Sequence, residues 1–350
     1  MKRMVVALSV ILLCVLPCHA ATYPEMDELW DQAENYGIME GESLEEGIGS
    51  LLSQASGELG GVFRQSTATA LKLTAVVLLC ALAEGAKGED DGLRVVEIAG
   101  ALAITALTMT DMDGMLGLGR ETIGEMGAFS KALLPVMAVL TAATGSPAGA
   151  AVRQGATVLF SQLLLTVMDS LLVPLVYSYV AVCCASAAIG TPGLDKLAGL
   201  LKSAVTFVLT ALLLAFVGYL TASGAIAGSA DASAVKAARM AITRAIPVVG
   251  GILADASETV LAGASSLRGV VGAAGMLVVL TICLAPFLHL AVHYLTYKVT
   301  AALCALVARP ALSRLIDAIG SAFGLVLGMT GAAALILLIS LVSALSAVIP

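Results

Sequence analysis

Residues 203–222 read SAVTFVLTALLLAFVGYLTA and contain no charged side chain. A helix of about 20 residues rises about 30 Å, which matches the hydrocarbon thickness of a bilayer. Because a helix satisfies its own backbone hydrogen bonds, it is the structure that such a stretch adopts in lipid. Two further stretches, 269–288 and 318–349, are also free of charge. The sequence therefore predicts an all-α protein, a polytopic transmembrane helical bundle.

The composition of the whole chain agrees with this fold class. Of its 350 residues, 59% are hydrophobic and 12% are charged, whereas soluble domains carry about 25% charged residues. The net charge of -7 comes largely from one region, since ten of the 25 acidic residues lie between Glu25 and Glu58. That region has no basic patch, so nucleic acid is not an expected partner.

The N-terminus has the pattern of a secretory signal peptide. Lys2 and Arg3 precede an apolar core, and a small-x-small cleavage motif ends at Ala20. We expect cleavage after Ala20, and the alternative is an uncleaved first membrane helix. The predicted organisation is a signal peptide at 1–20, an acidic extracytoplasmic segment with short amphipathic helices at 21–65, and a multi-span transmembrane domain at 66–350.

We expect about 7–8 spans in the multi-span domain, and Pro135 makes a re-entrant pair the alternative for the third and fourth. The positive-inside rule places 21–65 outside and Arg153, Lys196, Lys202 and Lys298 inside. The expected spans are 67–84, 93–110, 129–144, 150–169, 171–190, 203–224, 269–292 and 319–348.

The segment 229–268 has the most unusual pattern, because it combines an amphipathic helix, a break and a second helix start between two firm spans. Such discontinuous elements line substrate paths in transporters. The hypothesis is a pore-lining or gating hairpin, and the alternative is an interfacial loop with ordinary helix capping. The pore or gating candidates are Pro247, Gly250, Gly251, Asp255 and Glu258, and the amphipathic basic face consists of Lys236, Arg239 and Arg244.

Three other features have a structural and a functional interpretation. His289 and His293 share a helix face, but the acid of an HExxH motif is missing, and the tyrosines that follow favour a membrane-interface belt over a metal site. Asp169 is either a functional charge within an apolar region or part of a turn between two spans. The GxxxG spacing at Gly324 and Gly328 indicates close helix packing.

Residues 244–260, RAIPVVGGILADASETV, resemble the most recognisable segment of the stage III sporulation protein AE family of spore-forming Firmicutes. The segments ALKLTAVVLLCAL at 70–82, ALLPVMAVLTAATG at 132–145 and DKLAGLLK at 195–202 fall in the order expected of this family. The similarity covers most of the chain from about 67 to 340, whereas the acidic segment at 21–65 contains no motif that matches.

The resemblance implies a role that the residue patterns alone do not give. Members of the family look like integral membrane components of a transenvelope, secretion-like channel complex that links mother cell and forespore and is needed for late forespore gene expression. The implied partners are other stage III sporulation membrane and ring proteins, a secretion-type ATPase and a forespore partner across the intermembrane space. The implied location is the mother-cell membrane around the forespore, and no cofactor or metal is implied.

Two alternatives stay open. A stand-alone secondary transporter of a small solute would contain inverted repeats with two matching broken helices, and the chain has one clear break and one doubtful break near 135–147. A non-conducting membrane scaffold for the ring proteins and the ATPase would have the same sequence features as a channel subunit. The sequence contains no phosphate loop, dinucleotide fingerprint or GxSxG elbow, so we do not expect an enzyme.

Overall fold

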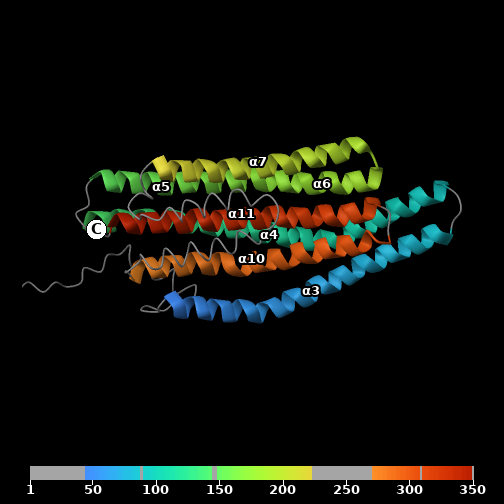
Figure 1. Cartoon of the computed structure of the whole chain (residues 1–350), viewed down its shortest axis with the longest axis horizontal. Coiled ribbons are helices and arrows are strands. Elements are labelled where there is room, and N and C mark those ends of the chain that lie inside the picture. The colour runs from blue at the N-terminus through green and yellow to red at the C-terminus, as the bar shows by residue number, and fades with distance from the viewer. Residues whose placement is uncertain (1–43, 87–89, 144–147, 223–269, 308–309, 349–350) are drawn as a thin grey trace, which may run out of the picture.

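The computed structural model describes residues 44–86, 90–143, 148–222, 270–307 and 310–348, and the regular structure within these ranges is helical (Figure 1). This confirms the predicted all-α class. The elements are α3 (Leu44–Ala86), α4 (Asp90–Ala143), α5 (Ala148–Val167), a π-helical turn η1 (Met168–Leu172), α6 (Val173–Ile189), α7 (Pro192–Ala222), α10 (Val270–Cys304) and α11 (Pro310–Val348).

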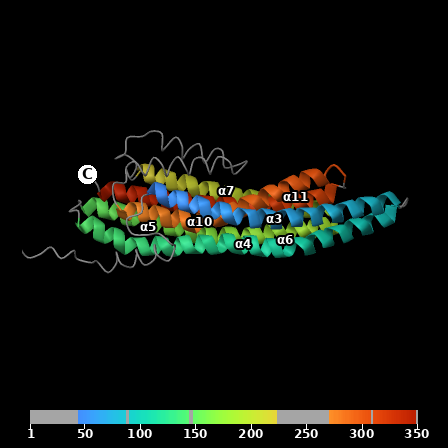
Figure 2. The ribbon, with the colours of Figure 1, turned by 90° about the horizontal axis from the view of Figure 1, so that it is seen from below.

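The helices lie side by side along one long axis, and successive passes alternate in direction (Figures 1 and 2). At one end of the bundle, called the Gly190 end, helices α3, α6 and α10 end and helices α4, α7 and α11 begin. The opposite, C-terminal end holds the start of α3 and the end of α11. The hairpin of α3 and α4 extends past the other helices at the Gly190 end (Figure 1).

The connection at Gly190 follows from local backbone chemistry. Gly190 has a φ of 73°, a left-handed conformation that glycine adopts without a Cβ clash, and its N–H donates to the carbonyl of Ser186 at 2.8 Å. Pro192 then begins α7, where the missing N–H of proline costs no helical hydrogen bond. The chain therefore reverses within two residues and packs α7 against α6.

Helix α11 forms the centre of the bundle, and α7 lies at its outside. In the apolar stretch of α11, 78% of the residues are buried, whereas in that of α7 only 11% are. Glycines allow the close approach of other helices to α11. A Cβ at Gly324 would lie 2.8 Å from the ring of Tyr294 in α10, which confirms close helix packing there.

Six helices of the described residues are long and apolar enough to cross a membrane: Leu59–Glu84, Val95–Ala132, Ala156–Ile189, Pro192–Thr221, Gly275–Cys304 and Pro310–Val342. The chain is a multi-pass membrane protein. The expected spans at 93–110 and 129–144 are parts of one helix, α4, which continues through Pro135. The chain outside the described residues leaves the total number of spans a prediction.

The expected spans at 150–169 and 171–190 also form one continuous helical rod. The break expected between 169 and 171 is replaced by η1, in which the N–H of Val173, next to Pro174, bonds to the carbonyl of Met168, five residues earlier. A π-turn lets a helix continue past a residue that cannot donate a hydrogen bond. Asp169 therefore lies inside a helix, and the interpretation as a turn between two spans is wrong.

Helix α3 begins before the expected start of the transmembrane domain at residue 66. The division expected between 21–65 and 66–350 falls inside α3, which is one helix from Leu44 to Ala86. The start of α3 packs against α10, since a Cβ at Gly47 would lie 2.6 Å from Leu277. The predicted signal peptide at 1–20 and the segment 229–268 lie outside the described residues.

Candidate functional site

Three charged residues stand where long charge-free stretches begin or end. Lys202 directly precedes the stretch 203–222, Asp317 directly precedes 318–349, and Lys298 follows 269–297. Because α7 and α11 run away from the Gly190 end and α10 runs toward it, all three residues reach the same level of the bundle. Charge-free stretches of several helices that begin or end at the same level are what a membrane boundary requires.

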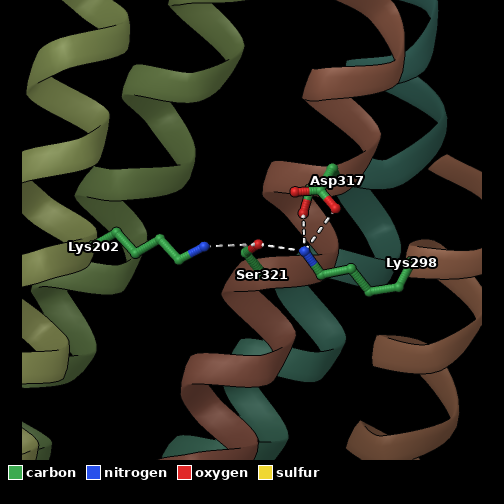
Figure 3. A network of polar contacts seen from close by, with 4 residues as sticks. All are labelled: Lys202, Lys298, Asp317 and Ser321. Carbon is green, nitrogen blue, oxygen red and sulfur yellow. Dashed lines mark hydrogen bonds and ion pairs between the residues drawn. The ribbon is translucent and has the colours of Figure 1, made fainter. Parts of the chain in front are cut away.

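The two lysines meet at the hydroxyl of Ser321, one turn after Asp317 on α11, and Asp317 joins the network through Lys298 (Figure 3). The Nζ atom of Lys298 donates to Ser321 Oγ at 2.7 Å and to Asp317 Oδ1 at 2.7 Å. From the opposite side, the Nζ atom of Lys202 donates to the same Oγ atom at 3.2 Å. The network therefore connects α7, α10 and α11 through side chains 119 and 23 positions apart in sequence.

The geometry of Lys298 argues for a structural role. An ammonium group has three N–H donors, and Lys298 Nζ has three oxygen neighbours, because it also lies 3.2 Å from the backbone carbonyl oxygen of Asp317. These contacts hold α10 against α11, so the arrangement positions helices relative to one another.

A second polar group lies nearer the Gly190 end and joins α6, α7 and α11. The hydroxyl of Ser186 donates to Asp195 Oδ1, and Arg314 Nη1 lies 3.5 Å from Asp195 Oδ2. The side chains of Arg314 and Asp195 are 67% and 56% exposed, so this ion pair contributes about 0.2–1 kcal/mol. Its main effect is to fix which helices are neighbours at this end.

A third polar contact is buried next to the network. The hydroxyl of Tyr297 donates to Asp111 Oδ2 at 3.0 Å, and Tyr297 is 1% exposed. Its ring packs edge-on against Phe323 with ring centroids 5.0 Å apart. This contact places a carboxylate of α4 inside the bundle, where it needs the hydroxyl as a partner.

The histidines of α10 also belong to the interior of the bundle. His293 is 2% exposed, its Nδ1 lies 2.9 Å from the carbonyl oxygen of His289, and its ring meets Phe323 edge-on. Placing His293 and Tyr297 in a membrane-interface belt was therefore wrong. Among the described residues, there is no group of three His, Cys, Asp or Glu side chains that could hold a metal ion.

The pore and gating candidates predicted from the sequence cannot be compared with this geometry. Pro247, Gly250, Gly251, Asp255 and Glu258 lie in 223–269, outside the described residues, and so does the basic face of Lys236, Arg239 and Arg244. Their role stays a prediction.

Sequence reasoning missed the network as a site, although its signal was present. The positive-inside rule assigns Lys202 and Lys298 to the inner side, but it does not single out Asp317 or Ser321. Taking the first charge beside each long charge-free stretch finds Lys202, Lys298 and Asp317 together. Ser321 has no such signal, because its part in the network depends on how α11 faces α7 and α10.

The geometry describes a membrane bundle with structural polar contacts, and comparison with known proteins gives its family. A family model described as Stage III sporulation protein AE matches residues 38–347. The chain belongs to the stage III sporulation protein AE family. It is a sporulation membrane protein.

A relative of the same name in Bacillus subtilis (strain 168) is 23% identical to the chain over 235 residues. The aligned region covers 67% of this chain and 59% of that relative, so the chain spans less than two thirds of the relative's length. No solved structure matches the chain. The family match includes all the helices of the described bundle except the terminal residue of α11.

Proposed function

We propose that the chain is an integral component of a transenvelope, secretion-like channel complex that links mother cell and forespore and that late forespore gene expression requires. Its partners in this proposal are other stage III sporulation membrane and ring proteins, a secretion-type ATPase and a forespore partner across the intermembrane space. Its place is the mother-cell membrane around the forespore.

The observation that carries the proposal is the family match across 38–347, because it extends over the whole bundle and the segment 244–260. The architecture also supports it. Six long apolar helices form an elongated bundle, and polar side chains of the described residues tie α7, α10 and α11 together. The doubtful break near 135–147 lies partly inside α4, which continues to Ala143, and this weakens the case for a transporter with two matching broken helices.

The test is a deletion of the gene in its spore-forming host, complemented with the full chain. We expect the deletion strain to lose expression of a late forespore reporter and to complete engulfment before it arrests. Full-length protein should restore the reporter and should co-purify with the ATPase and the ring proteins from sporulating cells. Normal late reporter expression in the deletion strain would contradict the proposal.

A second strain separates a channel subunit from a non-conducting scaffold. Replacing Gly250 and Gly251 together by leucine should restrict the backbone at the predicted helix break while leaving membrane insertion intact. If the segment gates a conduit, the double variant should still co-purify with its partners but should fail to restore the late reporter. A variant that assembles and restores the reporter fully would remove the gating hypothesis and favour the scaffold.

A further inference from the structure

The charges of α4 are unusual for a helix that crosses a membrane. Its longest charge-free stretch before Lys131, 98–110, rises only about 20 Å, which is too short to cross a hydrocarbon core of about 30 Å. Within the next stretch, 111–131, α4 carries six charged side chains: Asp111, Asp113, Arg120, Glu121, Glu125 and Lys131. Crossing the bilayer therefore places some of these charges at membrane depth.

Contacts with neighbouring helices give the level of this charged stretch. A Cβ at Gly119 would overlap Val326 of α11, and a Cβ at Gly328 would lie 3.7 Å from Leu209 of α7. Val326 lies in the charge-free stretch 318–349, and Leu209 lies in 203–222. The charged part of α4 is thus level with the parts of α7 and α11 that have the composition of membrane-spanning helix.

At this level, α4 presents a polar face outward. Asp113, Arg120, Glu121, Glu125 and Lys131 are exposed on the surface of the bundle. Spacings of seven and eleven residues, about two and three helical turns, place Asp113, Arg120 and Lys131 on one side of the helix. Gly114, Gly117 and Gly124 lie between them, and a Cβ at any of the three would have no atom of the described residues within 4 Å. We call this surface the α4 face.

The π-turn brings a further charge to the α4 face. Arg120 Nε donates to Asp169 Oδ1 at 3.1 Å, and the two side chains are 63% and 40% exposed. With Asp169, the face carries four acidic and two basic side chains. Asp113, Glu121, Glu125 and Asp169 are the acids, and Arg120 and Lys131 are the bases.

The opposite edge of the bundle has the surface expected toward lipid. Figure 2 shows α7 along one edge and α4 along the other. On α7, Phe207 is 73% exposed and Leu214 is 53% exposed. An ionised side chain exposed to hydrocarbon costs at least about 2.5–3.5 kcal/mol, whereas exposed Phe and Leu are favourable there. One edge therefore suits lipid, and the α4 face does not.

We infer that the α4 face lines an aqueous path through the membrane, which other subunits of the complex close on its remaining sides. This inference rests on the proposed channel function and assigns the path to α4. A dry contact with a second copy is disfavoured, because it would bury an excess of like charges and leave the space above the glycines to be filled. The net negative charge of the face favours cations in the path.

Cysteine labelling in sporulating cells, with the whole complex assembled, tests the inference. The five free cysteines of the described residues and the two at Cys14 and Cys18 are first replaced, and single cysteines are then placed at Asp113, Gly117 and Gly124. Matched controls are Leu163→Cys, Phe207→Cys and Leu214→Cys, since these side chains are 57%, 73% and 53% exposed on the apolar helices. The probes are two membrane-impermeant thiosulfonates, one positively and one negatively charged.

We expect each α4 position to react at least tenfold faster than every control, and faster with the positive reagent than with the negative one. Reaction rates equal to those of the controls would overturn the inference. So would protection from both reagents together with oxidative cross-linking of two copies through the same cysteine, because that result describes a dry interface. Immunoblots of the membrane fraction show that each variant is inserted.

The same strains keep this inference separate from the proposed function. If the α4 cysteines are protected while the deletion strain still arrests and the chain restores it, the aqueous path is wrong and the channel-complex proposal stands. If the α4 cysteines are labelled but deletion leaves late forespore expression normal, the proposed function fails and the polar path needs another role.

Discussion

Tyr297 and Asp111 illustrate how single residues stabilise this bundle. They are 186 positions apart in sequence, and their hydrogen bond joins α10 to α4 inside the protein. Asp111 is 9% exposed, so its carboxylate has little contact with solvent. A buried acceptor that loses its donor costs more than an average hydrogen bond contributes, because it also loses the compensation for its desolvation.

Replacing Tyr297 by phenylalanine should therefore destabilise the protein by about 1–3 kcal/mol, since the ring stays in place against Phe323 but the hydroxyl is lost. Thermal unfolding of the purified protein in detergent would measure the change. The matched control is Tyr294→Phe, on the same helix and packed against Gly324. Equal unfolding temperatures for the two variants would contradict a stabilising role for the Asp111 contact.

For single residues, the sequence predicted which charged side chains lie near the membrane boundary better than it predicted which side chains they contact. Lys202 and Lys298 were expected near the inner side of the membrane, and both lie where charge-free helix ends. That both contact Ser321 could not be predicted, because the contact depends on the rotation of three helices about their axes. Tyr297 and His293 were misplaced for the same reason: their composition is typical of an interface, but their helix face turns inward.

At Gly119, α4 packs against α11 without room for an added methyl group. A Cβ at this position would overlap Val326, whereas a Cβ at Gly114, five residues earlier on the same helix, would have no described atom within 4 Å. In membranes, small residues at a contact allow backbones to approach and gain dispersion energy. An added methyl group would therefore clash with α11 at Gly119 but would meet no described atom at Gly114.

Gly119→Ala should destabilise the bundle by about 1–3 kcal/mol, because Val326 or a helix backbone must move to make room. Gly114→Ala should be neutral or should stabilise the protein by up to about 1 kcal/mol, since alanine favours helix more than glycine does. Detergent unfolding midpoints of the two variants would test the difference. A Gly119 variant as stable as the Gly114 variant would mean that α4 and α11 do not pack closely here.

The extent of the helices was predicted less well than their existence. Charge-free runs located the apolar cores of α7, α10 and α11, because lipid solvation depends on composition alone. The sequence suggested helix ends near Pro135 and between 169 and 171, close to Pro174, that the structure does not have. Inside a bundle, neighbouring helices hold the chain straight and a π-turn bypasses the missing N–H, so proline alone does not define an end.

For the whole molecule, the alternation of the described helices determines which connections share a side. The end of α3 and the start of α4 lie at the Gly190 end together with 190–191, whereas α4 ends and α5 begins at the C-terminal end. With the loops after α3 and α6 inside, as their basic residues favour, Arg153 near the start of α5 lies on the outer side. The expectation that Arg153 is inside followed from dividing α4 and the α5–α6 rod into four spans.

A cysteine placed at Ser146 should react with an impermeant thiol reagent added outside the mother-cell membrane, and a cysteine at Thr191 should react only after the cells are permeabilised. Both variants carry no other cysteine, and their positions lie between helices, so insertion should not change. Labelling of the Ser146 position only after permeabilisation would contradict the alternation of the helices and favour the topology with more spans.

The π-turn has a consequence for how this sequence tolerates change. One residue more than an α-helical turn rotates everything before it by about 100° relative to everything after it. Ser161, upstream of the turn, is thereby aimed at Ser340, while Cys183, downstream, is buried. Removing a single amino acid between Met168 and Leu172 would rotate the helix upstream of the π-turn relative to the helix downstream of it. Every upstream side chain would then point in a new direction around the helix axis, and Asp169 could no longer contact Arg120.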